Sequence, residues 1–286
     1  MRLMYENLVD LSETTLSASS QAAGYPVSLI KDTLRKRAWR ATDSTQEHVI
    51  MQVPAGKTVS AFAITGHNLS LTATVELWKS ANGSTYTYVD QIDISPSTAS
   101  GYGVGFYGYG GYGGTDQSGV LVGSTQALFF TGVSSTSFPY WKAIFKDPNS
   151  ADFYIKCGRI FLGNYWEPTN QIIPGWRIEI VDETEISTLV SQQKVNNEKA
   201  IFERVTFSLP HLSVADAFDN FICLAIRTFK VTKRDVFLAL FPQNTISIFQ
   251  KDVTTVYGRF VGNEIGVSHV ASSSFTTGEL TFEESL

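Results

Sequence analysis

The residues that could do chemistry are scattered along this sequence of 286 residues. Its histidines lie in unrelated segments and at wide spacings, at His48, His67, His211 and His269. Carboxylates gather only at Asp182, Glu183 and Glu185, a pattern typical of a solvated turn. The sequence contains no nucleophile elbow, phosphate-binding loop, zinc-protease motif or EF-hand loop. It therefore predicts no catalytic residue, no metal site and no cofactor, and we expect a protein that is not an enzyme.

Thiol chemistry is not predicted either. Cys157 and Cys223 lie far apart and in different predicted elements. A cysteine without a nearby partner or motif behaves as a small apolar residue, so each is expected to be a buried free thiol.

The densest basic run, residues 31–40, holds five cations and Trp39. Such a composition can contact phosphates and bases. However, the run is short, Asp32 interrupts it, and the whole chain carries a formal charge of −5. We therefore interpret it as a solvated loop or a salt-bridging patch at a subunit contact, and expect no nucleic-acid binding.

Residues 101–114 interleave glycines with aromatic residues. Ordering so many glycines is entropically costly. The aromatic side chains offer apolar contact area to a partner, and binding to that partner could offset the cost. Two interpretations remain open: a flexible loop inserted in a hairpin, or an arm that orders against a neighbouring subunit or an external surface. The candidate binding residues are Tyr102, Phe106, Tyr107, Tyr109 and Tyr112.

The composition indicates a folded protein and suits protein–protein contact. Hydrophobic residues make up 43% of the chain and charged residues only 17%, which suits sheet surfaces that meet other proteins. The N-terminal residues form no long apolar run, so no signal peptide is expected. No stretch approaches the roughly 18 apolar residues of a membrane span.

Residues 1–163 show short β-branched or aromatic runs separated by turn formers. This pattern predicts a β-sandwich or jelly roll with residues 101–114 as an insertion. The expected strands are 48–53, 59–64, 73–78, 86–94, 127–130, 140–145 and 155–162.

Residues 164–175 hold two prolines and no clear period, and predict a linker. Residues 176–286 then predict a β domain with one α-helix at about 213–227, for which Ser213 offers an N-cap. Val214, Ala217, Phe218, Phe221, Ile222 and Ala225 would form its buried face. The expected strands are 176–181, 200–209, 236–241, 245–249, 255–261 and 279–284. The predicted fold class is therefore all-β, with one helix in the second domain.

The first half resembles the galactose-binding, discoidin-like domain. The matching segments follow one another in the family's order, at 18–20, 39–42, 49–53, 59–68, 75–84, 140–145 and 155–163. The resemblance implies a jelly-roll sandwich whose loops at one end bind sugar or calcium. Here residues 24–32 replace the family's acidic loop before the tryptophan, so the resemblance assigns neither a calcium site nor particular sugar-binding residues.

The second half looks like the tube-type fold of bacteriophage tails, in which a β-sandwich with a flanking helix packs into rings. Distal tail proteins combine such a domain with a galactose-binding-like one, commonly in the opposite order. The resemblance implies a structural subunit of a tail tip or baseplate. Its expected partners are copies of itself in a ring, as a hexamer or trimer, the tube, hub and fibre proteins, and host surface glycan. The expected location is the virion, after synthesis in the host cytoplasm.

Two alternatives remain. One is a carbohydrate-binding adhesin of the tail that recognises the receptor through exposed aromatic residues. Trp39, Trp78, Trp141 and Trp166 are available, but most lie in predicted strands, where a core role is expected. The other is a glycan-degrading enzyme, which would need two facing carboxylates whose separation the sequence does not give.

Overall fold

A computed structural model describes most of the chain. The described residues are 1–34, 36–70, 72–94, 128–130, 137–170, 172, 175–188, 194–197, 199–241, 254–262, 265–271 and 273–285. They form a mostly antiparallel β structure with one long helix, and the predicted all-β fold class is confirmed. No helix among them is long and apolar enough to cross a membrane.

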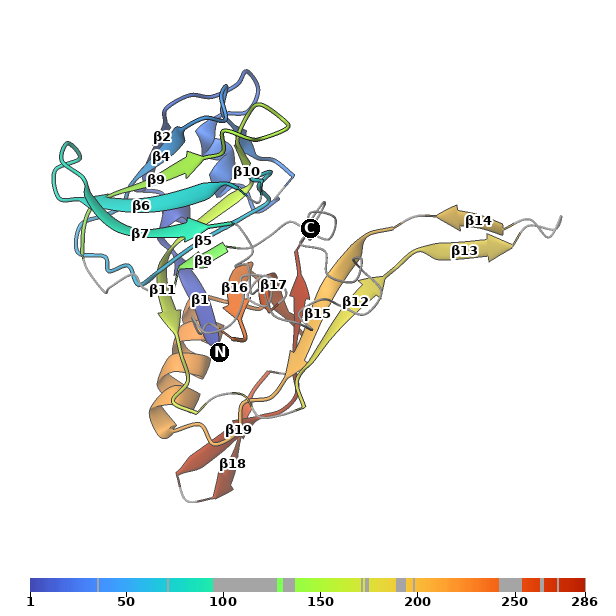
Figure 1. The fold of residues 1–286 in the computed structure, drawn as a ribbon. Helices are drawn as coiled ribbons and strands as arrows, with labels where there is room; N and C mark the ends of the chain where they lie inside the picture. Colours follow the sequence, from blue (N-terminus) through green and yellow to red (C-terminus); the bar gives the residue numbers. More distant parts are fainter. Residues whose placement is uncertain are drawn as a thin grey trace, which may run out of the picture.

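A five-stranded sheet forms one layer of a β-sandwich in the first half (Figure 1). Its strands, in spatial order, are β2 (Thr15–Ala18), β4 (Glu47–Gln52), β9 (Tyr140–Lys146), β6 (Thr74–Ser80) and β7 (Thr87–Asp93). Strand β4 alternates buried and partly exposed residues, as expected for a sheet with one covered face. Most of these strands match the predicted runs to within two residues.

The facing layer belongs to a nine-stranded sheet that continues into the second half. Its strands, in spatial order, are β12 (Arg177–Asp182), β15 (Ile201–Phe207), β20 (Leu280–Glu284), β17 (Thr255–Val261), β16 (Val236–Ala239), β1 (Arg2–Asn7), β11 (Arg159–Trp166), β5 (Ala61–Thr65) and β8 (Leu128–Phe130). Strand β1 lies in the middle, since Leu3 pairs with Trp166 on one side and Leu238 on the other. The predicted linker, 164–175, thus begins inside β11.

Two main cores lie beside this sheet. The first fills the sandwich with buried side chains such as Trp39, Trp141 and Phe145. The second lies between the sheet's other half and the helix, and includes Val205, Phe221 and Phe282. At about 25 cal/mol per Å² of apolar surface, these buried aromatic clusters supply much of the driving force for folding.

The predicted helix is present, but its type and face require correction. Helix η3 (Ala215–Thr228) is wound as a π-helix, and at its end the Phe229 amide donates to the Leu224 carbonyl five residues earlier. A π-helix has more residues per turn than the 3.6 of an α-helix. Residues spaced by four positions therefore lie on one side of η3. Accordingly Ala217, Phe221 and Ala225 are buried, whereas Val214 and Phe218, expected inside, are exposed.

Several elements were not predicted from the sequence. Among the strands these are β1, β2, the hairpin of β13 (Glu185–Thr188) and β14 (Lys194–Asn197), the hairpin of β18 (Val267–Ala271) and β19 (Ser274–Thr277), and β3 (Trp39–Arg40), which pairs with β10 (Lys156–Cys157). The 3-10 turns η1 (Leu8–Asp10) and η2 (Val27–Lys31) were not predicted either. The strand predicted at 245–249 lies outside the described residues.

A two-stranded ribbon, which we call the arm, projects from the second half (Figure 1). It consists of the outer ends of β12 and β15 and the hairpin of β13 (Glu185–Thr188) and β14 (Lys194–Asn197). Strand β12 pairs with β15 alone within the described sheet, so it forms the sheet's edge there.

Candidate functional site

Hydrogen bonds tie together the loops at one end of the sandwich. The buried Asp147 carboxylate accepts the Ser70 amide at 2.7 Å, and the Asp147 amide donates to the Ser44 carbonyl at 3.0 Å. Asn68 Nδ2 donates to the Tyr154 carbonyl, and Asn68 Oδ1 accepts the Lys156 amide. These bonds fix the loops relative to one another and make a preformed surface.

An arginine on that surface lies close to two tyrosine rings. The Arg40 guanidinium lies 3.4 Å from the centroid of the Tyr154 ring and 5.8 Å from that of Tyr25. Backbone bonds hold the same residues, because the Arg40 amide donates to the Tyr25 carbonyl. A cation on an aromatic face is attracted by the ring quadrupole, so the guanidinium and both rings are held in place.

Phe153, next to Tyr154, is the most exposed of the large apolar side chains in the described part of the chain, at 79%. Its φ is 57°, in the left-handed region that bulky residues rarely adopt. Such a conformation costs on the order of 1–3 kcal/mol and persists only where the surroundings impose it. Backbone strain of this kind clusters at functional sites, which makes Phe153 a candidate binding residue.

Polar groups border the rings. The exposed Asp152 carboxylate accepts Asn68 Nδ2 at 2.9 Å, and Lys156 is partly exposed on β10. We call Tyr25, Arg40, Asp152, Phe153 and Tyr154 the loop-end cluster. It offers flat apolar faces beside hydrogen-bonding groups, which suits a ligand with an apolar face and several hydroxyls.

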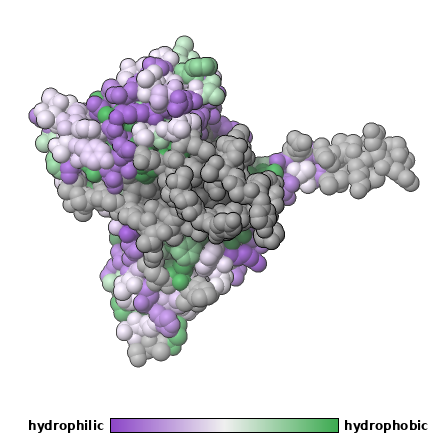
Figure 2. All heavy atoms as spheres, viewed as in Figure 1, coloured by the Kyte–Doolittle hydropathy of each residue, from purple (hydrophilic) through white to green (hydrophobic). Residues whose placement is uncertain are grey.

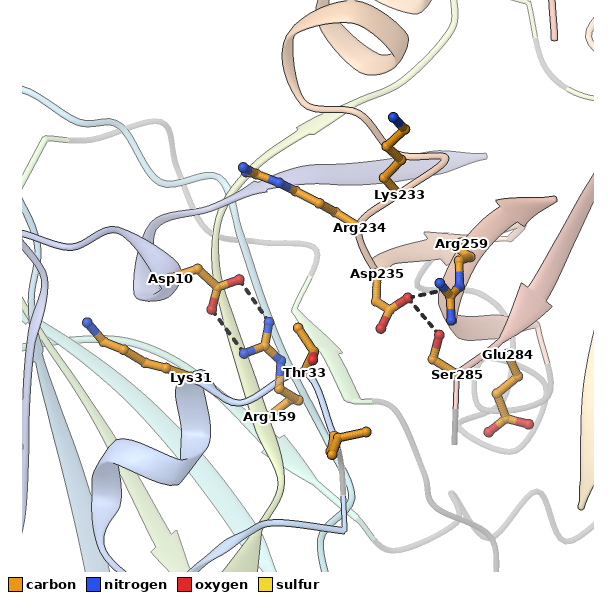
Figure 3. Close-up of a pocket in the computed structure, with 11 residues that line it drawn as sticks. Asp10, Lys31, Thr33, Arg159, Lys233, Arg234, Asp235, Arg259, Glu284 and Ser285 are labelled. Carbon is orange, nitrogen blue, oxygen red and sulfur yellow. Dashed lines mark hydrogen bonds and ion pairs between the residues drawn. The ribbon is translucent and has the colours of Figure 1, made fainter. Parts of the chain in front are cut away.

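A second candidate site is a crevice of about 530 Å³ between the two halves (Figure 3). On the first-half side it is lined by Asp10, Lys31, Thr33, Leu34 and Arg159, and on the second-half side by Lys233, Arg234, Asp235, Arg259, Glu284 and Ser285.

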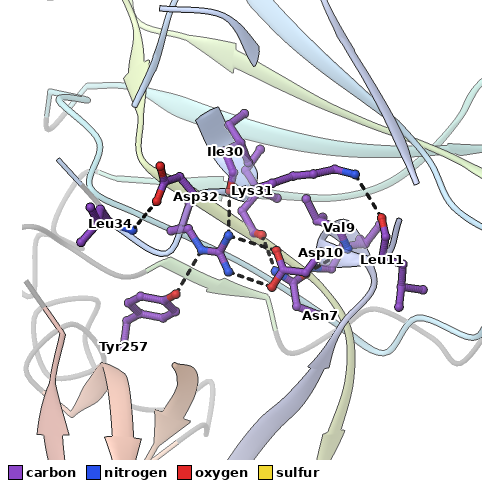
Figure 4. Close-up of polar contacts among 12 residues, drawn as sticks. Asn7, Val9, Asp10, Leu11, Ile30, Lys31, Asp32, Leu34 and Tyr257 are labelled. Carbon is purple, nitrogen blue, oxygen red and sulfur yellow. Dashed lines mark hydrogen bonds and ion pairs between the residues drawn. The ribbon is translucent and has the colours of Figure 1, made fainter. Parts of the chain in front are cut away.

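Arg159 is buried and lines the crevice (Figure 3), and its partners Asp10, Ile30 and Tyr257 are labelled in Figure 4. Its terminal nitrogens donate to both Asp10 carboxylate oxygens, at 3.0 and 2.8 Å, and to the Ile30 carbonyl. Its Nε donates to the Tyr257 hydroxyl at 3.0 Å. Arginine's planar fork suits such bidentate pairing. These contacts hold Arg159 in place, and the bond to Tyr257 joins the first half to the second.

Burial and the contacts between Arg159 and Tyr257 determine the ionisation of both side chains. Burial, which outweighs the nearby guanidinium, raises the pKa of Tyr257 to about 12. Burial acts to lower the pKa of Arg159, but Tyr257 and Asp10 outweigh it and the pKa is raised. The phenol is therefore neutral and the guanidinium charged across the physiological range.

The basic run divides between the crevice and its surroundings. Lys31 Nζ donates to the Leu11 and Thr14 carbonyls, and Arg37 pairs with Asp32 at 3.3 Å. The ion pair agrees with the interpretation as a solvated or salt-bridging segment. Across the crevice, Lys233 and Arg234 are exposed, and Arg234 extends toward the Asp10 side (Figure 3).

The candidate binding residues from the sequence, Tyr102, Phe106, Tyr107, Tyr109 and Tyr112, all lie outside the described residues. Trp39, Trp141 and Trp166 are buried, which confirms the core role expected of most tryptophans. Cys157 is buried as predicted, but Cys223 is exposed, because η3 turns the opposite side toward the core. In the described part of the chain, no three His, Cys, Asp or Glu side chains gather as a metal site.

The sequence gives little sign of the loop-end cluster, for a physical reason. Its members come from the loop before η2, from strand β3 and from the loop before β10, and no spacing links them. The one signal available was Phe153-Tyr154 within a polar turn, where two adjacent aromatic residues have no strand period to explain them.

No family model matches this chain, and no curated protein matches its sequence. Solved structures are similar to a little over half of it. CpGH89CBM32-5 from Clostridium perfringens, in complex with GalNAc-β-1,3-galactose, has 9% identity over 56% of this chain and 100% of that one, with a TM-score of 0.40. The family 32 carbohydrate-binding module of C. perfringens NanJ, in complex with galactose, has 18% identity over 58% and 100%, with a TM-score of 0.39.

A chitosan-binding module from Paenibacillus sp. IK-5 is similar at 13% identity over 56% of this chain and 99% of the module, with a TM-score of 0.38. All three TM-scores are below 0.5, so the description of the fold rests on the strand pairing given above.

Proposed function

We propose that this protein is a carbohydrate-binding recognition protein and that the loop-end cluster is its glycan site. The observation that carries the proposal is Phe153, a solvent-exposed ring held in a left-handed backbone conformation beside the Tyr154–Arg40–Tyr25 group. Aromatic rings cover the apolar face of a sugar, and Arg40 and Asp152 supply a donor and an acceptor for its hydroxyls.

The test is a glycan array with the purified full chain, followed by calorimetric titration with any sugar that binds. Galactose and GalNAc-β-1,3-galactose, present in two of the similar structures, are the first ligands to titrate. Phe153→Gly removes the ring and also relieves the strain at this position. We expect it to weaken binding about tenfold or more, equal to a loss of roughly 1.4 kcal/mol, without loss of stability.

Tyr88→Ala is the matched control, since Tyr88 is an exposed aromatic residue on β7, away from these loops. It should leave glycan affinity unchanged. Absence of binding to every glycan on the array, or equal affinity of the Phe153→Gly variant, would contradict the proposed site.

A second function is favoured by the arm. A two-stranded ribbon that leaves its own core is marginally stable in water and gains stability by packing on a partner. This supports the role of a structural subunit of a phage tail tip or baseplate, with the glycan site facing the host. Mass spectrometry of purified particles from the source phage should then find this chain at a fixed small multiple per particle. Its absence from the particles would exclude that role.

A further inference from the structure

The arm carries apolar and acidic side chains that its own core leaves uncovered. Ile180 is 75% exposed and Ile201 is 56% exposed. Because Ile180 pairs with Glu203 and Asp182 with Ile201, both isoleucines lie on the same face of the ribbon. Nearer the body this face carries Ile178 and Val205, which pack in the second core. The face thus continues the core beyond the point where the described residues cover it.

Two carboxylates follow on the same ribbon. Asp182, the last residue of β12, and Glu183, which follows it, are both exposed. Glu185, two residues later, forms an ion pair with Lys199, so the charge available at the root of the arm comes from Asp182 and Glu183. Figure 2 shows hydrophobic and hydrophilic atoms side by side at this root.

The crevice presents the complementary surface. Leu34, which lines it, is 50% exposed and offers an apolar contact. Arg159 pairs with Asp10, and Arg259 faces Asp235 at 3.6 Å. The lining as a whole holds five cationic and three acidic side chains, so its net charge is positive. Lys233 and Arg234 are exposed cations on the facing wall.

We infer that the arm of one copy of this chain docks in the crevice of a second copy, with Asp182 and Glu183 facing Lys233 and Arg234. The arm projects away from the body in Figure 1, so the contact is between molecules. Its two surfaces are different, so the contact is heterologous and closes into a ring when the rotation permits. The inference rests on the assembly role proposed above and does not involve the glycan site.

Charge reversal tests this pairing on the full chain. Wild-type protein should self-associate in sedimentation velocity, and more weakly at high salt, because salt screens exposed charges. Lys233→Glu with Arg234→Glu should weaken self-association about tenfold or more, and Asp182→Lys with Glu183→Lys should do the same. Mixing the two variants should restore association, since the reversed arm then fits the reversed crevice. Arg177→Glu with Glu179→Arg on β12 is the control, and should have no effect.

The possible results separate the inference from the assembly role. If the wild type associates and neither reversal weakens it, the arm–crevice contact is wrong while assembly stands. If the reversals weaken association but mixing does not restore it, the two surfaces do not face each other. A wild type that stays monomeric at every concentration would overturn both.

Discussion

Arg159 and Tyr257 meet across the boundary between the two halves of the chain, with the arginine Nε 3.0 Å from the phenolic oxygen. Arg159 lies on β11 and Tyr257 on β17. Both side chains are buried. The pair therefore connects the sandwich to the second half by a charge-assisted hydrogen bond, and the stability of the joint depends on it.

Replacing Arg159 with Leu should destabilise the protein by about 3 kcal/mol, near the lower end for breaking a buried ion pair. The loss of stability lies at the lower end of that range because the Asp10 carboxylate is partly exposed and regains contact with water. The change also leaves the Ile30 carbonyl and Tyr257 hydroxyl without their donor. Urea unfolding measures the effect. Arg177→Ala, which removes an exposed ion pair, should change stability by less than about 0.5 kcal/mol. Equal losses of stability in the two variants would argue against a stabilising role for Arg159 between the halves.

The raised pKa of Tyr257, about 12, predicts a loss of stability at alkaline pH. Between roughly pH 10 and pH 12 the unfolded chain has released this proton and the folded chain still holds it. The free energy of unfolding must then fall as pH rises through this window, because the folded state binds more protons. Tyr257→Phe removes this contribution. The free energy of unfolding of this variant should therefore fall less steeply than that of the wild type from pH 9.5 to 11.5. Urea unfolding at each pH measures it. Parallel curves of unfolding free energy against pH for the two proteins would count against the raised pKa of Tyr257.

The two cysteines should differ sharply in reactivity. Cys157 is buried, and burial raises the pKa of its thiol to about 12, whereas Cys223 is exposed on η3. Since the thiolate is the reactive form, a disulfide reagent should titrate one thiol in the native protein and two after denaturation. The Cys223→Ser variant should show no fast reaction in the native state. Fast reaction of that variant would mean that Cys157 is accessible.

Gly163 should not tolerate a side chain. A Cβ built there would lie 1.9 Å from the Glu6 carbonyl oxygen on the neighbouring β1. Strand β1 must shift to accommodate it, so Gly163→Ala should cost at least the roughly 1–3 kcal/mol typical of overpacking. Thermal unfolding gives the comparison with Gly266→Ala, where no atom lies within 4 Å. A Gly163→Ala variant as stable as the control would contradict the register of β1 against β11.

Local pattern predicts the strands that have one face in a core. Strand β4 alternates buried and partly exposed residues and begins within one residue of the predicted start. The pattern also predicts the two strands at the root of the arm, at 176–181 and 200–209, but it does not predict that Ile180 and Ile201 lie on a face that the described residues leave exposed. The turn that carries Phe153 is tied to a segment distant in sequence, because Asn68 bonds to Asp152 and Tyr154, and the Arg159–Asp10 pair spans 149 positions. Neither the loop-end cluster nor the joint could be found from spacing alone.

The central place of β1 bears on how the protein is made. This strand leaves the ribosome well before its two neighbours, which are β11, at residues 159–166, and β16, which ends at residue 239. Such long-range pairing is slow, because the closure of long loops must precede it. Until β16 has been synthesised, one edge of β1 has no partner and can pair with other chains. Nascent chains of this protein are therefore expected to need protection from aggregation until the second half has emerged.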